Sequence, residues 1–226
     1  MSRSLVALLG LVLALVFTGP AVSAQDAADL EAIAEVVLAT DQADLVAALE
    51  EPITDSDLPG GFLAPVNGVP ENADIIDAFV SGMGDLGGVA TPVNQGLDTD
   101  PKLIPGLLST AVITYMVTEE EITEDDLADF ADGVEEGLAD DPTMEGTVEQ
   151  VELFDSEAVL STLTLEQDGI FVVVQMLAIP VGSTMVVGTL LSADQTEVDS
   201  TDILPLTEDL TVAGVEYLGT AAEAAG

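Results

Sequence analysis

The sequence predicts an α+β fold: a curved antiparallel sheet, arranged as a meander, that helices cover in a sandwich of the α/β/α type. Three observations lead to this class. The C-terminal half contains several apolar or alternating segments of strand length, tight-turn sequences separate them, and segments with helical apolar spacing precede and follow them. Such an order of elements is typical of helices layered on an antiparallel sheet.

The composition fits one globular domain with an extreme surface charge. Of the 226 residues, 48% are hydrophobic and 20% are charged, and 43 acidic residues against two basic ones give a formal net charge of −41. Because phosphate binding requires Lys or Arg, we expect no nucleic-acid partner and no binding to anionic membrane surfaces. A salt-adapted surface and a basic protein partner, whose identity stays unknown, are compatible with this charge.

The first 24 residues have the pattern of a signal peptide. Arg3 precedes an apolar run from Leu5 to Phe17, and Val22-Ser23-Ala24 fits the small-residue cleavage pattern. The run is shorter than the roughly 20 residues that a spanning helix needs, so an uncleaved anchor is the lesser alternative. We expect cleavage near Ala24 and a secreted or extracytoplasmic, soluble protein.

Residues 25–51 are predicted to form an N-terminal helical arm of two short helices, with Asp41 as the N-cap of the second. The pattern leaves open whether this arm packs on its own domain. Residues 52–108 are rich in Gly and Pro, so we expect little regular structure there apart from a helix over residues 73–81. Leu58 and Phe62 indicate that this stretch is a covering segment packed on the domain.

Residues 109–226 form the predicted sandwich domain. Thr123-Glu124-Asp125-Asp126 is a start signal for an amphipathic helix that reaches Leu138, and Asp168-Gly169 predicts a tight hairpin. A turn is expected over residues 180–183, and a last helix over residues 205–223 with Pro205 in its first turn. Strands are expected over residues 111–117, 147–154, 158–167, 170–179 and 185–192.

The order of these elements over residues 109–223 resembles that of the PsbP-like domains, small exported α/β/α sandwiches. The chain also looks like related secreted or lipid-anchored bacterial proteins of unknown activity, in which a leader such as Thr54 to Phe62 precedes the sandwich. The resemblance implies a non-catalytic accessory domain that docks on a larger extracytoplasmic assembly, in some members with a role in retaining ions. It is a resemblance of topology and supplies no site residues.

The composition excludes several enzyme classes. The sequence has no His and no Cys, so Ser-His-Asp and Cys-His nucleophile systems and the usual zinc sites cannot be assembled. Once the predicted signal peptide with Arg3 is removed, Lys102 is the one basic residue, so phosphoryl-transfer clamps are missing as well. The glycine string at residues 82–87 has dinucleotide-binding spacing but follows a predicted helix, and we interpret it as a turn. We expect no enzyme and no organic cofactor.

Closely spaced acids in predicted loops are the candidate metal ligands, because Ca²⁺ prefers several oxygen ligands. The candidates are Asp55, Asp57, Asp98, Asp100, Glu119 and Glu121. The loops that begin at Asp55 and Asp98 do not fit the EF-hand pattern, since Pro59 and Lys102 stand at its fifth place. Calcium binding, or a hydrolase that uses two carboxylates, is the first alternative function.

The apolar runs Phe171 to Val174 and Met185 to Val187 support a further alternative. Such runs are typical of a central strand covered on both faces, but they also line apolar pockets. The leading hypothesis is an exported, non-catalytic binding or accessory domain whose acidic surface gives solubility in salt. A carrier of a hydrophobic ligand is the further alternative, and the sequence leaves the oligomeric state open.

Overall fold

The computed structural model describes residues 24–64, 90–104, 106, 108–140, 145–167 and 169–226. Residues 1–23 of the predicted signal peptide, the predicted helix over residues 73–81, the glycine string at residues 82–87 and Asp168 lie outside these ranges. The helices are α2 (Ala24–Ala39), α3 (Gln42–Leu49), α6 (Glu124–Asp140) and α7 (Ser200–Ala225), with a short 3₁₀ helix η1 (Asp55–Asp57). The strands are β1 (Phe62–Leu63), β2 (Thr91–Thr99), β3 (Leu108–Val117), β4 (Glu145–Leu153), β5 (Ser156–Gln167), β6 (Ile170–Val181) and β7 (Thr184–Asp194). No helix in the described ranges is long and apolar enough to cross a membrane.

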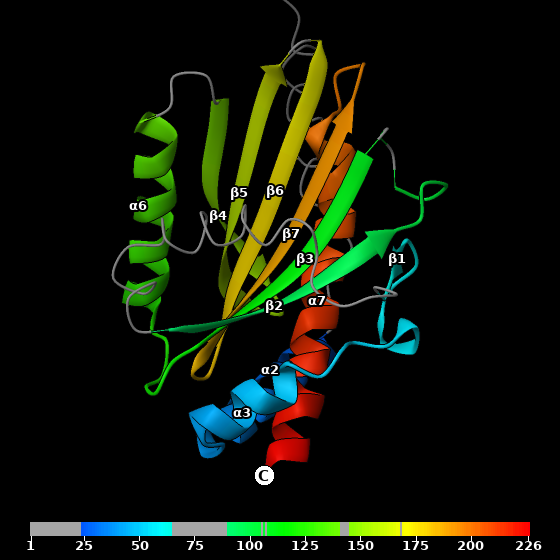
Figure 1. The fold of residues 1–226 in the computed structure, drawn as a ribbon. Helices are drawn as coiled ribbons and strands as arrows, with labels where there is room; N and C mark the ends of the chain where they lie inside the picture. Colours follow the sequence, from blue (N-terminus) through cyan, green and yellow to red (C-terminus); the bar gives the residue numbers. More distant parts are fainter. Residues whose placement is uncertain (1–23, 65–89, 105, 107, 141–144, 168) are drawn as a thin grey trace, which may run out of the picture.

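The described strands form one antiparallel sheet in the order β1-β2-β3-β7-β6-β5-β4 (Figure 1). β7 therefore lies at the centre, between β3 and β6. The chain leaves β3, passes through α6 and enters the far edge of the sheet as β4, from which β5, β6 and β7 return as a meander. The α+β class and the covered antiparallel sheet are confirmed.

Helices cover both faces of the sheet (Figure 1). α7 crosses one face with α2 and α3 packed against it, and α6 lies on the opposite face over β4 and β5. Because side chains alternate along a strand, a strand that is covered on both faces contributes to two cores. In β3, Ile113 and Tyr115 belong to the core under α7, whereas Val112 and Met116 belong to the core under α6.

Two predicted helix starts are confirmed. The Asp41 carboxylate accepts the N–H of Ala43 at 3.0 Å and caps α3. At the start of α6, Asp126 Oδ2 accepts the Thr123 N–H at 2.8 Å, and the Asp126 N–H donates back to Thr123 Oγ1 at 3.4 Å. This reciprocal pair is a capping box with Asp in the acidic position.

α7 starts earlier than the sequence predicts. The Asp199 side chain accepts the N–H of Thr201 at 2.9 Å, so the helix begins at Ser200 and Pro205 lies in its interior. A proline there removes one backbone hydrogen bond. The N-cap and the buried apolar face of the helix outweigh the loss of this hydrogen bond. The prediction that Pro205 lies in the first turn is wrong, because the helix begins five residues before it.

The predicted hairpin turns hold in part. Gln167 pairs with Ile170, which makes the β5–β6 connection a tight hairpin with Gly169 at a φ of 77°. The next turn is shorter than expected, because Pro180 and Val181 still belong to β6. Pro180 lies beyond the residues of β6 that pair with β5, where a missing N–H is tolerated.

The Gly/Pro-rich segment contains a strand that the sequence does not predict. β2 pairs with β3 from Thr91 opposite Val117 to Leu97 opposite Ala111, so the expectation of little regular structure is wrong there. Its Pro92 is tolerated because β1 pairs only with the far end of β2 and leaves this part as an edge.

The N-terminal arm packs on its own domain. The buried Gln95 side chain of β2 donates through Nε2 to the carbonyl oxygens of Leu49 at 2.6 Å and Glu51 at 3.0 Å. The hydroxyl of Tyr217 in α7 donates to the same Glu51 carbonyl. Because β2 and α7 both hold the end of α3, the arm is an integral part of the fold. Phe62, further along, is buried as well.

Candidate functional site

Four of the six predicted metal ligands lie towards opposite ends of β2. Asp98 and Asp100 lie where β2 meets β1. The run from Glu119 to Glu121 follows β3, whose last residue, Val117, pairs with Thr91 at the start of β2. The strand from Thr91 to Asp98 is about 24 Å long at the rise of an antiparallel strand. No single cation can therefore contact both groups.

Two of the predicted ligands are engaged in local hydrogen bonds. Asp100 Oδ1 accepts the N–H of Lys102 at 2.9 Å, which is the pattern of an Asx turn. Asp57 accepts a hydrogen bond from the Thr54 hydroxyl. Asp55 opens η1, and its side chain lies outside the described part of the structure.

Glu119, Glu120 and Glu121 line a hollow of about 550 Å³ together with Asp126. Hydrogen bonds from the side chain and then the backbone of Thr123 lower the pKa of Asp126 against a smaller opposing effect of burial, so this carboxylate is already engaged. Across the described ranges, no three His, Cys, Asp or Glu side chains are gathered so as to hold a metal ion. Calcium binding stays a prediction.

Glu208, which is not among the predicted site residues, has a raised pKa. Glu208 in α7 is partly buried, and its burial, followed by the charge of Asp209, raises its pKa. Consecutive residues on a helix point about 100° apart, so these two carboxylates do not face one substrate as an acid–base pair.

The apolar runs that could have lined a pocket belong to the cores. Met185, Val186 and Val187 are fully buried, and Val173 is 2% exposed. Val173 and Val186 face the core under α7, whereas Met185 and Val187 face the core under α6. Coverage on both faces therefore explains why these runs do not alternate.

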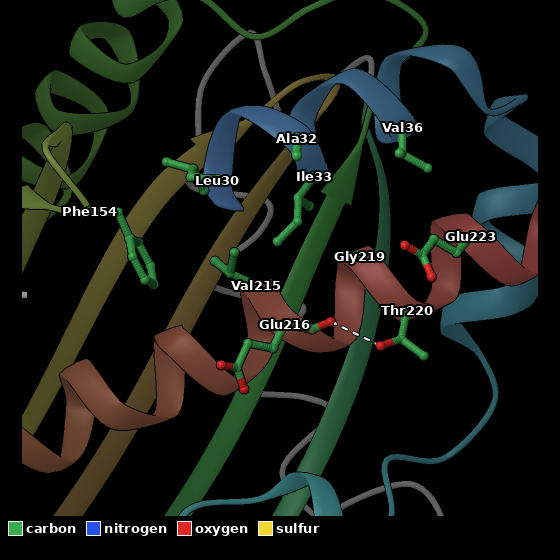
Figure 2. Close-up of a pocket in the computed structure, with 10 residues that line it drawn as sticks. All are labelled: Leu30, Ala32, Ile33, Val36, Phe154, Val215, Glu216, Gly219, Thr220 and Glu223. Carbon is green, nitrogen blue, oxygen red and sulfur yellow. Dashed lines mark hydrogen bonds between the residues drawn. The ribbon is translucent and has the colours of Figure 1, made fainter. Parts of the chain in front are cut away.

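An apolar groove of about 380 Å³ lies between α2 and α7 (Figure 2). We call it the α2–α7 groove. Leu30, Ile33 and Val36 of α2 and Val215 of α7 supply its apolar lining, and the ring of Phe154 reaches it from the β4–β5 turn. Glu216 and Glu223 of α7 also line it and are exposed, so an apolar surface lies beside carboxylates.

Two glycines set how closely α2 lies against its neighbours. A Cβ built on Gly219 of α7 would lie 3.0 Å from Ile33 Cγ1. A Cβ built on Gly182, in the β6–β7 turn, would lie 2.8 Å from the carbonyl oxygen of Ala34. The contact at Gly182 is closer than a real Cβ comes to a backbone oxygen, and the one at Gly219 would require Ile33 to shift by a few tenths of an ångström. These glycines therefore keep α2 close to α7 and to the sheet, and thereby shape the groove.

Phe154 has a backbone conformation that is rare for a bulky residue. Leu153 pairs with Ser156, and Phe154 and Asp155 between them have φ values of 56° and 58°. Positive φ at both positions is typical of a type I′ hairpin, which favours Asn and Gly. β4 ends at Leu153, so the predicted extension of this strand through Phe154 is wrong, and nothing in the local sequence pattern indicates the turn.

The fold and the groove define the class: an α+β domain with an open antiparallel sheet, helices on both faces and a surface groove between helices. No family model and no curated protein matches the chain. Among solved structures it is similar to LpqN, described as involved in cell envelope biogenesis of Mycobacterium tuberculosis, with 16% sequence identity, 70% of this chain and 84% of that chain covered, and a TM-score of 0.32. A likeness of this size supports no inference about binding or activity. The resemblance to PsbP-like domains is not confirmed.

Proposed function

We propose that the protein is an exported, non-catalytic accessory domain that binds a partner through the α2–α7 groove. The observation that carries this proposal is the groove itself, an open hollow in which apolar side chains of α2 and α7 lie beside exposed carboxylates. Export is supported by the signal-peptide pattern of residues 1–24. The lack of His and Cys supports a non-catalytic role.

The conformation of Phe154 is a second support. A bulky side chain at positive φ costs about 1–2 kcal/mol, and such residues persist where the surrounding structure holds them and often where they serve function. Here the strained turn places an aromatic ring at the end of the groove (Figure 2). Aromatic rings at the edge of an apolar surface are frequent anchors in binding sites.

The test uses Nile red, an uncharged dye that brightens in apolar surroundings and is not repelled by carboxylates. Ala32 lines the groove and is exposed, so Ala32→Trp should obstruct the groove without entering a core. Ala39→Trp, at the exposed end of α2 and away from the groove, is the matched control. We expect saturable binding that Ala32→Trp weakens about tenfold, a loss of about 1.4 kcal/mol, and that Ala39→Trp leaves unchanged. Equal binding by both variants would overturn the proposal.

The acidic surface supports adaptation to salt, because added ions screen the repulsion among carboxylates. We expect the unfolding midpoint to rise with ionic strength whichever salt supplies it. A saturable rise with calcium at fixed ionic strength would instead favour the calcium-binding alternative, since a ligand stabilises the state that it binds.

A further inference from the structure

We infer that the partner is a basic amphipathic helix of another protein, which lies along α7 with its cations over a row of carboxylates and its apolar side chains on either side. This inference rests on the proposed function and names the class of partner for that groove.

Two hollows, each lined by both apolar and acidic residues, flank α7 on both sides. One is the α2–α7 groove. The other, of about 450 Å³, lies between η1 and α7, and Leu58, Pro59 and Val212 are among its lining residues. Glu216 and Thr220 line both hollows, so the two are separated by a single ridge of α7.

Three carboxylates follow α7 in a regular row: Glu216 lines both hollows, Asp209 lines only the hollow beside η1, and Glu223 lines only the α2–α7 groove. Asp209, Glu216 and Glu223 are all exposed and stand seven residues apart. At seven residues a helix returns to nearly the same side, so the three side chains lie on one face at intervals of about 10.5 Å. We call them the carboxylate ridge.

The chain has little to neutralise this ridge with, since its basic residues are Arg3 in the leader and Lys102 in the turn after β2. An anionic lipid would be repelled by the ridge, and a small apolar ligand would need one hollow only. A helix that carries Lys or Arg at heptad spacing, with Leu-like residues beside them, matches both the charges and the two apolar flanks. The ridge spans about 21 Å, which corresponds to a partner helix of about 15 residues.

The probe is a synthetic 18-residue helical peptide with Lys at heptad spacing flanked by Leu, and a scrambled peptide of the same composition is its control. Binding to the purified protein is followed by fluorescence anisotropy. The ridge variant combines Asp209→Asn, Glu216→Gln and Glu223→Gln. The matched variant combines Asp129→Asn, Asp132→Asn and Glu136→Gln, which removes the same charge from exposed positions of α6.

We expect the ridge variant to weaken peptide binding about tenfold and the α6 variant less than about twofold, because exposed ion pairs contribute modestly and these three act together. The scrambled peptide should bind the unmodified protein about tenfold more weakly. Equal losses in both variants would mean general attraction to an acidic protein and would overturn the inference, as would equal binding of the scrambled peptide.

Nile red binding separates this inference from the proposed function. The α6 variant should keep it, because α6 lies on the opposite face of the sheet and contributes no residue to the groove. If the dye binds in the groove and the peptide does not, the inference fails and the proposed function stands. If lysophosphatidylcholine displaces the dye while the peptide does not, the occupant is a lipid. If neither dye nor peptide binds, both proposals fail.

Discussion

Gly188 of β7 meets Thr211 of α7 where the helix crosses the sheet. A Cβ built on Gly188 would lie 2.2 Å from Thr211 Oγ1 and 3.1 Å from the Thr211 backbone nitrogen. Thr211 Oγ1 donates to the Thr207 carbonyl at 2.8 Å, which holds the hydroxyl in place. The absence of a side chain at Gly188 therefore sets the distance between α7 and the centre of the sheet.

We predict that Gly188→Ala lowers the free energy of unfolding by about 1–3 kcal/mol, the usual range for overpacking. Urea denaturation measures the loss. Gly60→Ala is the control, because a Cβ there has no atom within 4 Å and should change stability by less than about 0.5 kcal/mol. Adding Thr211→Ala to Gly188→Ala should recover part of the loss. Equal stability of the two glycine variants would show that α7 does not lie this close.

Gln95 should be essential for holding the N-terminal arm. Gln95→Ala removes the side-chain donor to the carbonyls of Leu49 and Glu51, and we expect a loss of about 1–3 kcal/mol. Hydrogen exchange should become faster in α3. Tyr217→Phe leaves Gln95 bonded to Glu51 and should have a smaller effect. Unchanged exchange in α3 upon Gln95→Ala would contradict the proposed attachment.

The capping box of α6 should make stability depend on pH. The pKa of Asp126 is lower in the folded state because of Thr123, so its contribution is present above the ordinary aspartate pKa of about 4 and is lost as the pH falls through the lower folded value. We predict that Asp126→Asn costs about 0.5–1 kcal/mol at pH 7 and that the difference shrinks in acid. Asp129→Asn, exposed on the same helix, is the control. A difference between Asp126→Asn and the unmodified protein that persists in acid would refute this reading.

At the β4–β5 turn, one substitution should relieve backbone strain and at the same time weaken dye binding. Phe154→Asn places a residue suited to positive φ at the turn but removes the ring from the groove. We expect weaker Nile red binding with a change in stability below about 1 kcal/mol, because relief of strain offsets the lost burial. Asp155→Gly, at the other turn position, should leave dye binding unchanged. If Phe154→Asn binds the dye as well as the unmodified protein, the Phe154 ring does not contribute to the binding site.

Ser161 should contribute little to stability despite its complete burial. Among the described residues its hydroxyl has no hydrogen-bond partner. Ser161→Ala removes an unpaired polar group, and we predict a gain of about 0–1 kcal/mol. Thr207→Val is the contrasting variant, because that hydroxyl donates to Gln175 Oε1 and to the Ile203 carbonyl, each at 3.2 Å. The midpoint of thermal unfolding should be higher for Ser161→Ala than for Thr207→Val. The reverse order would contradict the description of the Ser161 hydroxyl as unpaired.

Local signals account for what the sequence predicts well. The capping residues Asp41 and Thr123 act on the turn that follows them, and Gly169 supplies a conformation that the β5–β6 hairpin requires. β2 escapes prediction because Pro92 and Gly96 break the strand pattern, and pairing with β3 forms the strand in spite of them.

The groove depends on residues that are distant in the sequence. Ile33 and Val215 lie on different helices at the two ends of the described chain, and Phe154 comes from a turn between strands. No periodicity relates these three positions, so their meeting follows from how α2 docks on α7. The spacing of apolar residues predicts which face of a helix or strand is apolar, but it does not show whether a neighbouring element covers that face.

β7 is the last strand of the chain and yet the middle strand of the sheet. Without it the other strands would form two separate ribbons, β1-β2-β3 and β6-β5-β4, each with an open inner edge. A chain that emerges from its N-terminus can therefore form local hairpins but cannot close its sheet until the stretch from Thr184 to Asp194 has arrived. Closure of the sheet therefore depends on β7, the strand that joins the two ribbons.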